Sequence, residues 1–124
     1  MSHIVSIRTR VTDPLALAAA CRRLGLPEPA SGTVTLYSAQ VTGLVVRLAG
    51  WHYPVVVDTA SGEVQFDNYN GAWGRQSELD KLLQAYAVEK TRVEARRQGH
   101  MLTEQRLADG SIKLTLQVGA GGAG

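Results

Sequence analysis

Aromatic side chains concentrate in two short, turn-rich segments of the chain. Residues 50–53 read GWHY and residues 67–74 read DNYNGAWG, and together they hold both tryptophans and two of the four tyrosines. Rings beside glycine and asparagine are typical of recognition surfaces, because a ring offers a large contact area at low entropic cost. We therefore consider Trp51, Tyr69 and Trp73 candidate binding residues. The alternative is that the tryptophans cap the core and the small residues only form a tight turn.

Three polar residues offer a second possibility, a small-ligand or enzymatic site. Asp58 and Asp67 close two adjacent strand-like runs, and His52 lies just before the first run. Paired carboxylates are useful for acid–base chemistry where burial or mutual repulsion separates their pKa values. Such a site requires the three side chains to converge within hydrogen-bond reach. No serine elbow, phosphate-binding loop or Cys–His signature accompanies them, so we expect no catalytic residue and no cofactor.

Metal ligation has weaker support in the sequence. Residues 67–71 alternate oxygen-bearing side chains before a glycine, as calcium loops do, but a glutamate at the required distal spacing is missing. The three histidines, His3, His52 and His100, are far apart in the sequence and form no helical His-x-x-x-His pair. We therefore expect no metal site.

A basic stretch raises nucleic-acid binding as a further alternative. The segment from Lys90 to Arg97 carries four basic residues, but Glu89 and Glu94 are spaced to form intrahelical ion pairs with them. A solvated, charge-laced helix face is the preferred interpretation. The formal charge of +2, from 13 basic and 11 acidic residues, is too balanced to argue for a nucleic-acid partner by itself.

The overall composition indicates one folded domain. The chain has 124 residues, of which 44% are hydrophobic and 19% charged. Its single cysteine, Cys21, excludes an internal disulfide and is expected in the core, so we expect a cytoplasmic protein. No apolar run approaches the roughly 18 residues that a membrane span needs, and we expect no membrane association.

Hydrophobic periodicity and turn residues predict the elements that position these candidates. Residues 4–10 alternate as a strand, and a helix follows from Asp13, as N-cap, to Gly25. Short connections between the next strands favour an antiparallel meander. These strands are predicted at 33–38, 44–49, 53–58 and 63–67, with turns at Thr42-Gly43, Gly50 and 60–62.

The second half of the chain predicts a long helix and a hairpin. The helix begins with Ser77 as N-cap and ends before Gly99. The hairpin joins residues 100–107 to residues 112–118 through an Asp-Gly turn. In its second strand Ile112, Leu114, Leu116 and Val118 share one face, which we expect to be buried.

The elements together predict a single α+β domain over residues 1–118, followed by a flexible Gly/Ala tail over residues 119–124. The order is β-α-β-β-β-β-α-β-β, an antiparallel sheet with two α-helices packed on one face. The leading function is a non-enzymatic protein-interaction or adaptor module of unknown partner and oligomeric state.

Specific segments along nearly the whole chain also carry a family resemblance. They are Met1-Ser2-His3-Ile4, Ile7-Arg8-Thr9, the helix led by Asp13, the strand 53–58, the aromatic segment 67–74, Gln84-Ala85-Tyr86-Ala87 and Asp109-Gly110-Ser111-Ile112. With these residues the chain resembles the hypothetical chloroplast reading frame thirty-five family, a domain of unknown function in plastids, cyanobacteria and other bacteria. The aromatic segment is similar to the bacterial branch. The resemblance implies an accessory role beside an AAA-type ATPase, because family members are often encoded near one.

Overall fold

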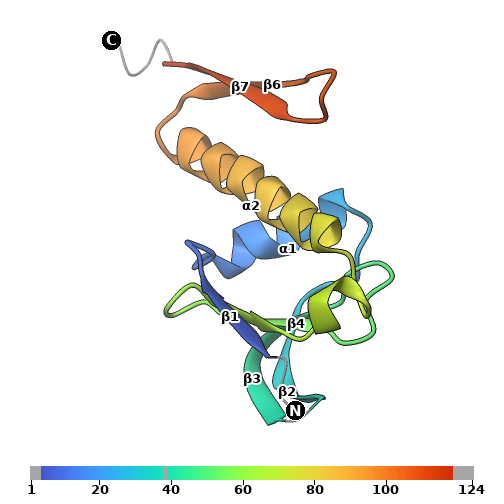
Figure 1. Cartoon of the computed structure of the whole chain (residues 1–124). Helices are drawn as coiled ribbons and strands as arrows, with labels where there is room; N and C mark the ends of the chain where they lie inside the picture. Colours follow the sequence, from blue (N-terminus) through green and yellow to red (C-terminus); the bar gives the residue numbers. More distant parts are fainter. Residues whose placement is uncertain (1–3, 38, 119–124) are drawn as a thin grey trace.

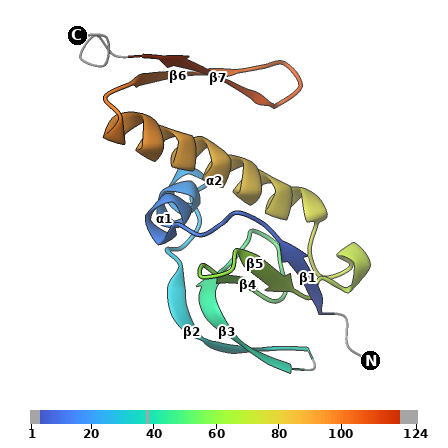
Figure 2. The same cartoon turned by 90° about the vertical axis from the view of Figure 1, so that its left-hand side faces the viewer.

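The computed structural model describes residues 4–37 and 39–118, so His3 and the predicted tail, residues 119–124, lie outside the described residues. Within this part the chain forms three layers: a five-stranded antiparallel sheet, two helices on one face of it, and a hairpin beyond the longer helix (Figures 1 and 2). The predicted α+β class and element order are confirmed. The elements are β1 (Val5–Arg8), α1 (Pro14–Arg23), β2 (Ala30–Leu36), β3 (Ala39–Val46), β4 (Val55–Asp58), β5 (Glu63–Phe66), the 3₁₀ turn η1 (Tyr69–Gly71), α2 (Gln76–Arg97), β6 (Met101–Arg106) and β7 (Ile112–Gln117).

The five-stranded sheet has the order β1-β5-β4-β3-β2, and every described pair in it is antiparallel. Side chains alternate between its two faces, as a pleated strand requires. Val55 and Val57 point toward the helices and are buried in the main core with the apolar side of α1 and α2. Val56 points to the opposite face and is buried in a separate, smaller cluster. The central strand is therefore buried on both faces.

The predicted boundaries of α1 are confirmed by its capping contacts. The Asp13 carboxylate accepts hydrogen bonds from the backbone N–H groups of Leu15 (3.0 Å) and Ala16 (3.4 Å). Gly25, at φ +71°, ends the helix in the left-handed conformation that glycine adopts without a steric penalty. Cys21 is fully buried on the inner face, and burial raises the pKa of its thiol to about 11. The expectation of a core cysteine is therefore confirmed.

The prediction of a turn at Thr42-Gly43 is wrong, because both residues lie inside β3. Glycine serves close approach here and not a turn. A Cβ atom on Gly43 would lie 2.7 Å from the carbonyl oxygen of Val57 and 2.9 Å from a methyl group of Val56. Position 43 of β3 can therefore lie this close to β4 only because glycine has no side chain.

The prediction of Ser77 as the N-cap of α2 is also wrong. The helix begins at Gln76, and Arg75 is the N-cap residue without a side-chain capping bond. Tertiary contacts fix this start instead, because the indole N–H of Trp51 donates to the Arg75 carbonyl at 3.0 Å. Gly74, next to it, packs so closely on Trp51 that a Cβ atom would lie 2.4 Å from the indole ring.

The smaller apolar cluster forms on the sheet face that is turned away from the helices. Leu36, Val41 and Val56 are its buried members, and Val34 and Tyr53 pack around them. Leu36 and Val41 belong to the far half of the β2–β3 hairpin, which curves away from the helices (Figure 2). This curvature brings the hairpin back over the strand face that carries Val56.

The β6–β7 hairpin lies on the side of α2 that faces away from the sheet (Figures 1 and 2). Its predicted buried face is buried only in part. Ile112 and Leu114 are half-buried, whereas Leu116 is 50% exposed and Val118 is 66% exposed. The face of α2 that meets the hairpin presents charged side chains such as Arg92, which pairs with the hairpin. Part of the apolar face therefore has no apolar counterpart.

Candidate functional site

Trp73 is the hub of an aromatic cluster. Its ring stacks on that of Tyr69, with centroids 4.7 Å apart and an interplanar angle of 29°. The rings of Tyr37, Tyr53 and His52 lie 5.4, 5.6 and 5.8 Å from the Trp73 ring. His52 and Tyr53 also meet edge to face at 4.5 Å. We call these five residues the aromatic cluster.

Three loops that are far apart in the sequence position the cluster. Tyr37 comes from the turn between β2 and β3, residues 52–53 from the β3–β4 connection, and the other two rings from the segment between β5 and α2. Backbone hydrogen bonds join the second loop to the third and brace the third internally. The His52 N–H donates to the Trp73 carbonyl at 2.7 Å, and the Trp73 N–H donates to the Asn68 carbonyl at 2.9 Å. The side-chain amide of Asn68 donates to the Gly74 carbonyl at 3.2 Å, which closes the segment on itself.

The backbone of the cluster is strained at Tyr69. This residue has φ +48° and the next, Asn70, has φ +53°, both in the left-handed region. Asparagine tolerates that region, but a bulky residue such as tyrosine is rarely found there. A carboxylate oxygen of Asp67 holds the strained turn by accepting the Tyr69 N–H at 3.2 Å. Such strain costs about 1–3 kcal/mol per residue and concentrates at functional sites.

Asp67 itself is an unusual support for a turn. It is 0% exposed, and its second carboxylate oxygen, Oδ2, has no hydrogen-bond donor among the described residues. A buried polar atom without a donor costs about 1–3 kcal/mol. The segment between β5 and α2 therefore combines two unfavourable features, the strained backbone of Tyr69 and the buried carboxylate beneath it.

The aromatic cluster has an exposed rim on an apolar base. Tyr37 is 52% exposed and Tyr69 is 44% exposed, and His52 is also exposed. Tyr53 and Trp73 are half-buried between them. Tyr53 also packs against the smaller apolar cluster, so the rings rest on the buried face of the sheet. Ring contacts and packing on the sheet therefore hold the side chains of the cluster in place.

The structure groups two of the three predicted binding residues and sets the third apart. Tyr69 and Trp73 lie in the aromatic cluster, whereas Trp51 packs against the main core. The Trp51 ring meets Phe66 edge to face at 5.7 Å, and its N–H bonds to the Arg75 carbonyl. The core-capping interpretation therefore describes Trp51. The sequence did not predict Tyr37 as a member of the cluster. Tyr37 reaches Trp73 because the β2–β3 hairpin is curved, and no local sequence pattern indicates that curvature.

The three polar candidates do not form a hydrogen-bonded constellation in the described residues. Asp58 is exposed and accepts the Ala60 N–H at 3.0 Å within a turn. Asp67 is buried and holds the turn at Tyr69, while His52 contacts aromatic rings. The described residues also contain no group of three histidine, cysteine or acidic side chains arranged to hold a metal ion.

Three of the four basic residues on the basic face of α2 form ion pairs. The Lys90 ammonium lies 3.0 Å from Asp13 and 3.0 Å from Glu94, and hydrogen bonds to Glu94 and Asp13 raise its pKa. Arg97 lies 3.5 Å from Glu94. Arg92 pairs with Glu104 of the hairpin. These pairs match the predicted charge-laced helix face.

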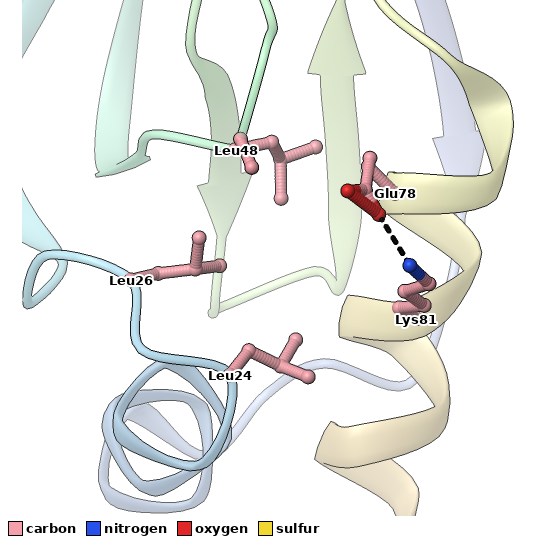
Figure 3. Close-up of a pocket in the computed structure, with 6 residues that line it drawn as sticks. Leu24, Leu26, Leu48, Glu78 and Lys81 are labelled. Carbon is pink, nitrogen blue, oxygen red and sulfur yellow. Dashed lines mark ion pairs between the residues drawn. The ribbon is translucent and has the colours of Figure 1, made fainter.

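Several hollows lie beside the helices. One, of about 150 Å³, has a wall of Leu24, Leu26 and Leu48 and an ion pair between Glu78 and Lys81 at its rim (Figure 3). Ligand pockets are typically about 300–1,000 Å³, so this hollow is small for a cofactor.

Another hollow is an open groove of about 660 Å³ between the β1–α1 loop and α2. The Tyr86 hydroxyl at its wall accepts the backbone N–H groups of Thr12 and Asp13 and donates to the Arg10 carbonyl. Because these polar groups bond to one another, they hold the loop on the helix.

Comparison of the chain with protein-family models, with curated proteins and with solved structures finds no match. Membership of the reading frame thirty-five family therefore stays a prediction. Neither helix in the described part of the chain is long and apolar enough to cross a membrane.

Proposed function

We propose that this protein is a non-enzymatic protein-interaction or adaptor module and that the aromatic cluster is its contact surface. One observation carries the proposal: Tyr69 is held in a strained, left-handed backbone conformation with its ring stacked on Trp73 and 44% exposed. A core-capping turn gains nothing from keeping a large ring exposed at the cost of strain. A binding surface gains a preorganised ring, because little entropy is then lost on association.

The chemistry of the cluster fits a protein partner. Tyrosine and tryptophan are enriched among the residues that dominate binding energy in protein interfaces. Each ring combines apolar area with a polar group, so it can contact apolar side chains and still bond at the rim. A backbone bond joins the loops that carry His52 and Trp73, and ring contacts hold Tyr37 against Trp73, so the surface is formed before the partner arrives.

The resemblance to the reading frame thirty-five family suggests which partner to try first. Family members are often encoded near an AAA-type ATPase, so we propose such an ATPase as the first candidate and an accessory role for this chain. The first alternative, a small-ligand site near Asp58 and Asp67, has less support because Asp58, Asp67 and His52 make separate contacts. The second, nucleic-acid binding through the face from Lys90 to Arg97, has less support because basic side chains of that face pair with acidic ones.

A pulldown tests the proposal with the Tyr69→Ala/Trp73→Ala double variant as bait. Wild type and variant are immobilised at equal density, and recovery of the AAA-type ATPase is measured by quantitative mass spectrometry. Removal of two central rings costs about 2 kcal/mol or more each at an interface, about 4 kcal/mol together, so we expect the affinity to fall by roughly 1,000-fold and recovery to fall accordingly. Circular dichroism must show that the variant remains folded.

Leu15→Ala is the matched control. Leu15 is 73% exposed on α1, so its truncation removes an exposed apolar side chain outside the aromatic cluster. We expect the control to recover the ATPase like wild type. Equal recovery by wild type and the folded double variant would contradict the role of the cluster. Absence of binding by wild type would remove this ATPase as the partner.

A further inference from the structure

The outer edge of β7 is open. In the described chain β6 and β7 form a two-stranded sheet of their own, so each strand has one neighbour. An unpaired strand edge is a template for another strand. Natural edge strands are commonly protected by charges or proline, whereas β7 reads IKLTLQ and carries only one charge.

The apolar face of β7 is half covered. Its inner half, Ile112 and Leu114, is partly buried, but Leu116 and Val118 are 50% and 66% exposed. These four residues alternate on one face, with Lys113, Thr115 and Gln117 on the other. A partner that adds to this edge must therefore continue an apolar face on one side and a polar face on the other.

We propose that β7 pairs antiparallel with β7 of a second copy of this chain, about a two-fold axis at Thr115. In this register Leu114 lies opposite Leu116 of the second copy, and Ile112 lies opposite Val118 of the second copy. The symmetric contacts repeat these pairs, so every apolar residue of the strand meets an apolar residue. The product is one four-stranded sheet in the order β6-β7-β7-β6, which extends the layer on α2.

The residue pattern of β7 supports a second copy of this chain as the occupant. Lys113 lies opposite Gln117 of the second copy in this register, so two like charges are kept apart. A register shifted by one residue would place apolar residues opposite polar ones on both faces. Residue types in 112–118 are symmetric about Thr115, so this sequence complements itself: apolar residues meet apolar ones and polar residues meet polar ones. The contact is isologous, as two-fold dimers require.

Sedimentation equilibrium tests the dimer, with Leu116→Lys as the disrupting variant. We expect wild type at tens of micromolar to sediment at twice the chain mass. One substitution places two ammonium groups in the symmetric contact, so we expect the dissociation constant to rise at least about 10-fold. We expect the variant to stay folded, because Leu116 is half-exposed in the monomer. Thermal unfolding followed by circular dichroism checks this.

Cysteine cross-linking tests the register. Thr115→Cys places a thiol on the proposed axis, about 5 Å from its equivalent in the second copy. Thr103→Cys is the matched control, since Thr103 is the exposed cross-strand neighbour of Thr115 on β6. Its equivalent would lie about three strand spacings away, roughly 14 Å. A bismaleimide of about 8 Å should therefore link the first variant and not the second, and the buried Cys21 should stay unmodified.

Each outcome decides the proposal. Linked Thr115→Cys dimers, together with a wild-type dimer that Leu116→Lys weakens, would support it. A monomer at all concentrations would overturn it, as would linkage through Thr103→Cys, which would place the contact on β6. The Tyr69→Ala/Trp73→Ala variant should dimerise like wild type, because the aromatic cluster lies on other loops. A failure of the adaptor proposal can thus be separated from a failure of the dimer.

Discussion

Two antiparallel hairpins of this protein differ in how far their apolar residues are buried. The β2–β3 hairpin is continuous with the large sheet and curves over it, so that Leu36 is 0% and Val41 8% exposed. The β6–β7 hairpin lies on a helix, and Leu116 remains 50% exposed. Both contain strand residues with apolar alternation. The difference shows that alternation fixes which side chains share a face, while the surrounding layers decide whether that face is buried.

The two hairpins are also attached by different forces. A hydrogen-bond ladder joins β3 to β4, and apolar packing covers the far half of the hairpin. The apolar residues of the β6–β7 hairpin are at most half-buried, and ion pairs join it to the helices. Glu104 of β6 pairs with Arg23 of α1 and with Arg92 of α2, and Arg23 also lies 3.2 Å from Glu89. We expect the first hairpin to unfold with the domain and the second to open separately.

Truncation of equivalent leucines should separate the hairpins most clearly. Leu36→Ala removes a fully buried side chain, so we expect it to lower the free energy of unfolding by about 2–5 kcal/mol. Leu116→Ala removes a half-exposed side chain and should cost below about 1 kcal/mol in the monomer. Urea unfolding at low protein concentration measures both. Similar losses for the two variants would show that the hairpins are buried alike.

The next effect concerns the bend in β3. Gly43→Ala places a Cβ atom 2.7 Å from the Val57 carbonyl oxygen, so β3 must move away from β4. We expect a loss of about 1–3 kcal/mol in the free energy of unfolding.

Gly32→Ala is the matched control for this bend. Gly32 is the cross-strand partner of Gly43, and no atom lies within 4 Å of a Cβ built on it. It should be neutral or slightly stabilising in the same urea titration, because alanine restricts the unfolded chain. A neutral Gly43→Ala would mean that the hairpin does not need the close approach.

Local signals in the sequence predicted the elements, and contacts between distant segments account for the errors. Asp13 and Gly25 mark the ends of α1 because capping and positive φ are properties of single residues. Gly43 is a glycine like Gly25, but it is needed because β4 approaches it closely, and no local sequence pattern indicates that approach. The start of α2 likewise depends on Trp51, 24 residues before the Arg75 carbonyl that it bonds.

The candidate site could be predicted only in part for the same reason. Tyr69 and Trp73 are four residues apart, so composition alone placed them together. Tyr37 joins them through the curvature of the β2–β3 hairpin, and Trp51 leaves them for the core. The sequence shows which residues are aromatic, but it does not show on which side of the sheet each ring lies.

The free energy of unfolding, measured as a function of pH, should test how far the ion pairs of Glu104 stabilise the β6–β7 hairpin. Hydrogen bonds from Arg23 and then Arg92, against the opposing effect of burial, lower the pKa of Glu104 from 4.5 to about 2. A folded-state pKa below the unfolded value stabilises the protein above pH 4.5, and this stabilisation is lost as the pH falls toward 2. Glu104→Gln should therefore cost about 1 kcal/mol at pH 7 and little at pH 2.

Hydrogen exchange of the hairpin amides at pH 7 locates this effect. Glu104→Gln should speed exchange in β6 and β7 while β2 and β3 keep their protection, because the charges attach only the second hairpin. Glu28→Gln is the control: Glu28 pairs with Arg22 at 3.1 Å, but both side chains are more than half exposed, so its loss should be close to neutral. Uniformly faster exchange over the whole domain would contradict separate opening.

The smallest difference is expected between two cross-strand threonine pairs. In β2–β3 the hydroxyl groups of Thr33 and Thr42 lie 2.7 Å apart, and in β6–β7 Thr103 and Thr115 are paired without a hydroxyl bond in the described structure. All four are exposed, so burial does not separate the pairs. Alanine double-mutant cycles should give a coupling of about 0.2–1 kcal/mol for the first pair and a smaller one for the second. A fixed hydroxyl bond requires strands that hold their register, and the β2–β3 hairpin is held by the sheet. Equal couplings would indicate that β6 and β7 are held as firmly, through a contact outside the single chain.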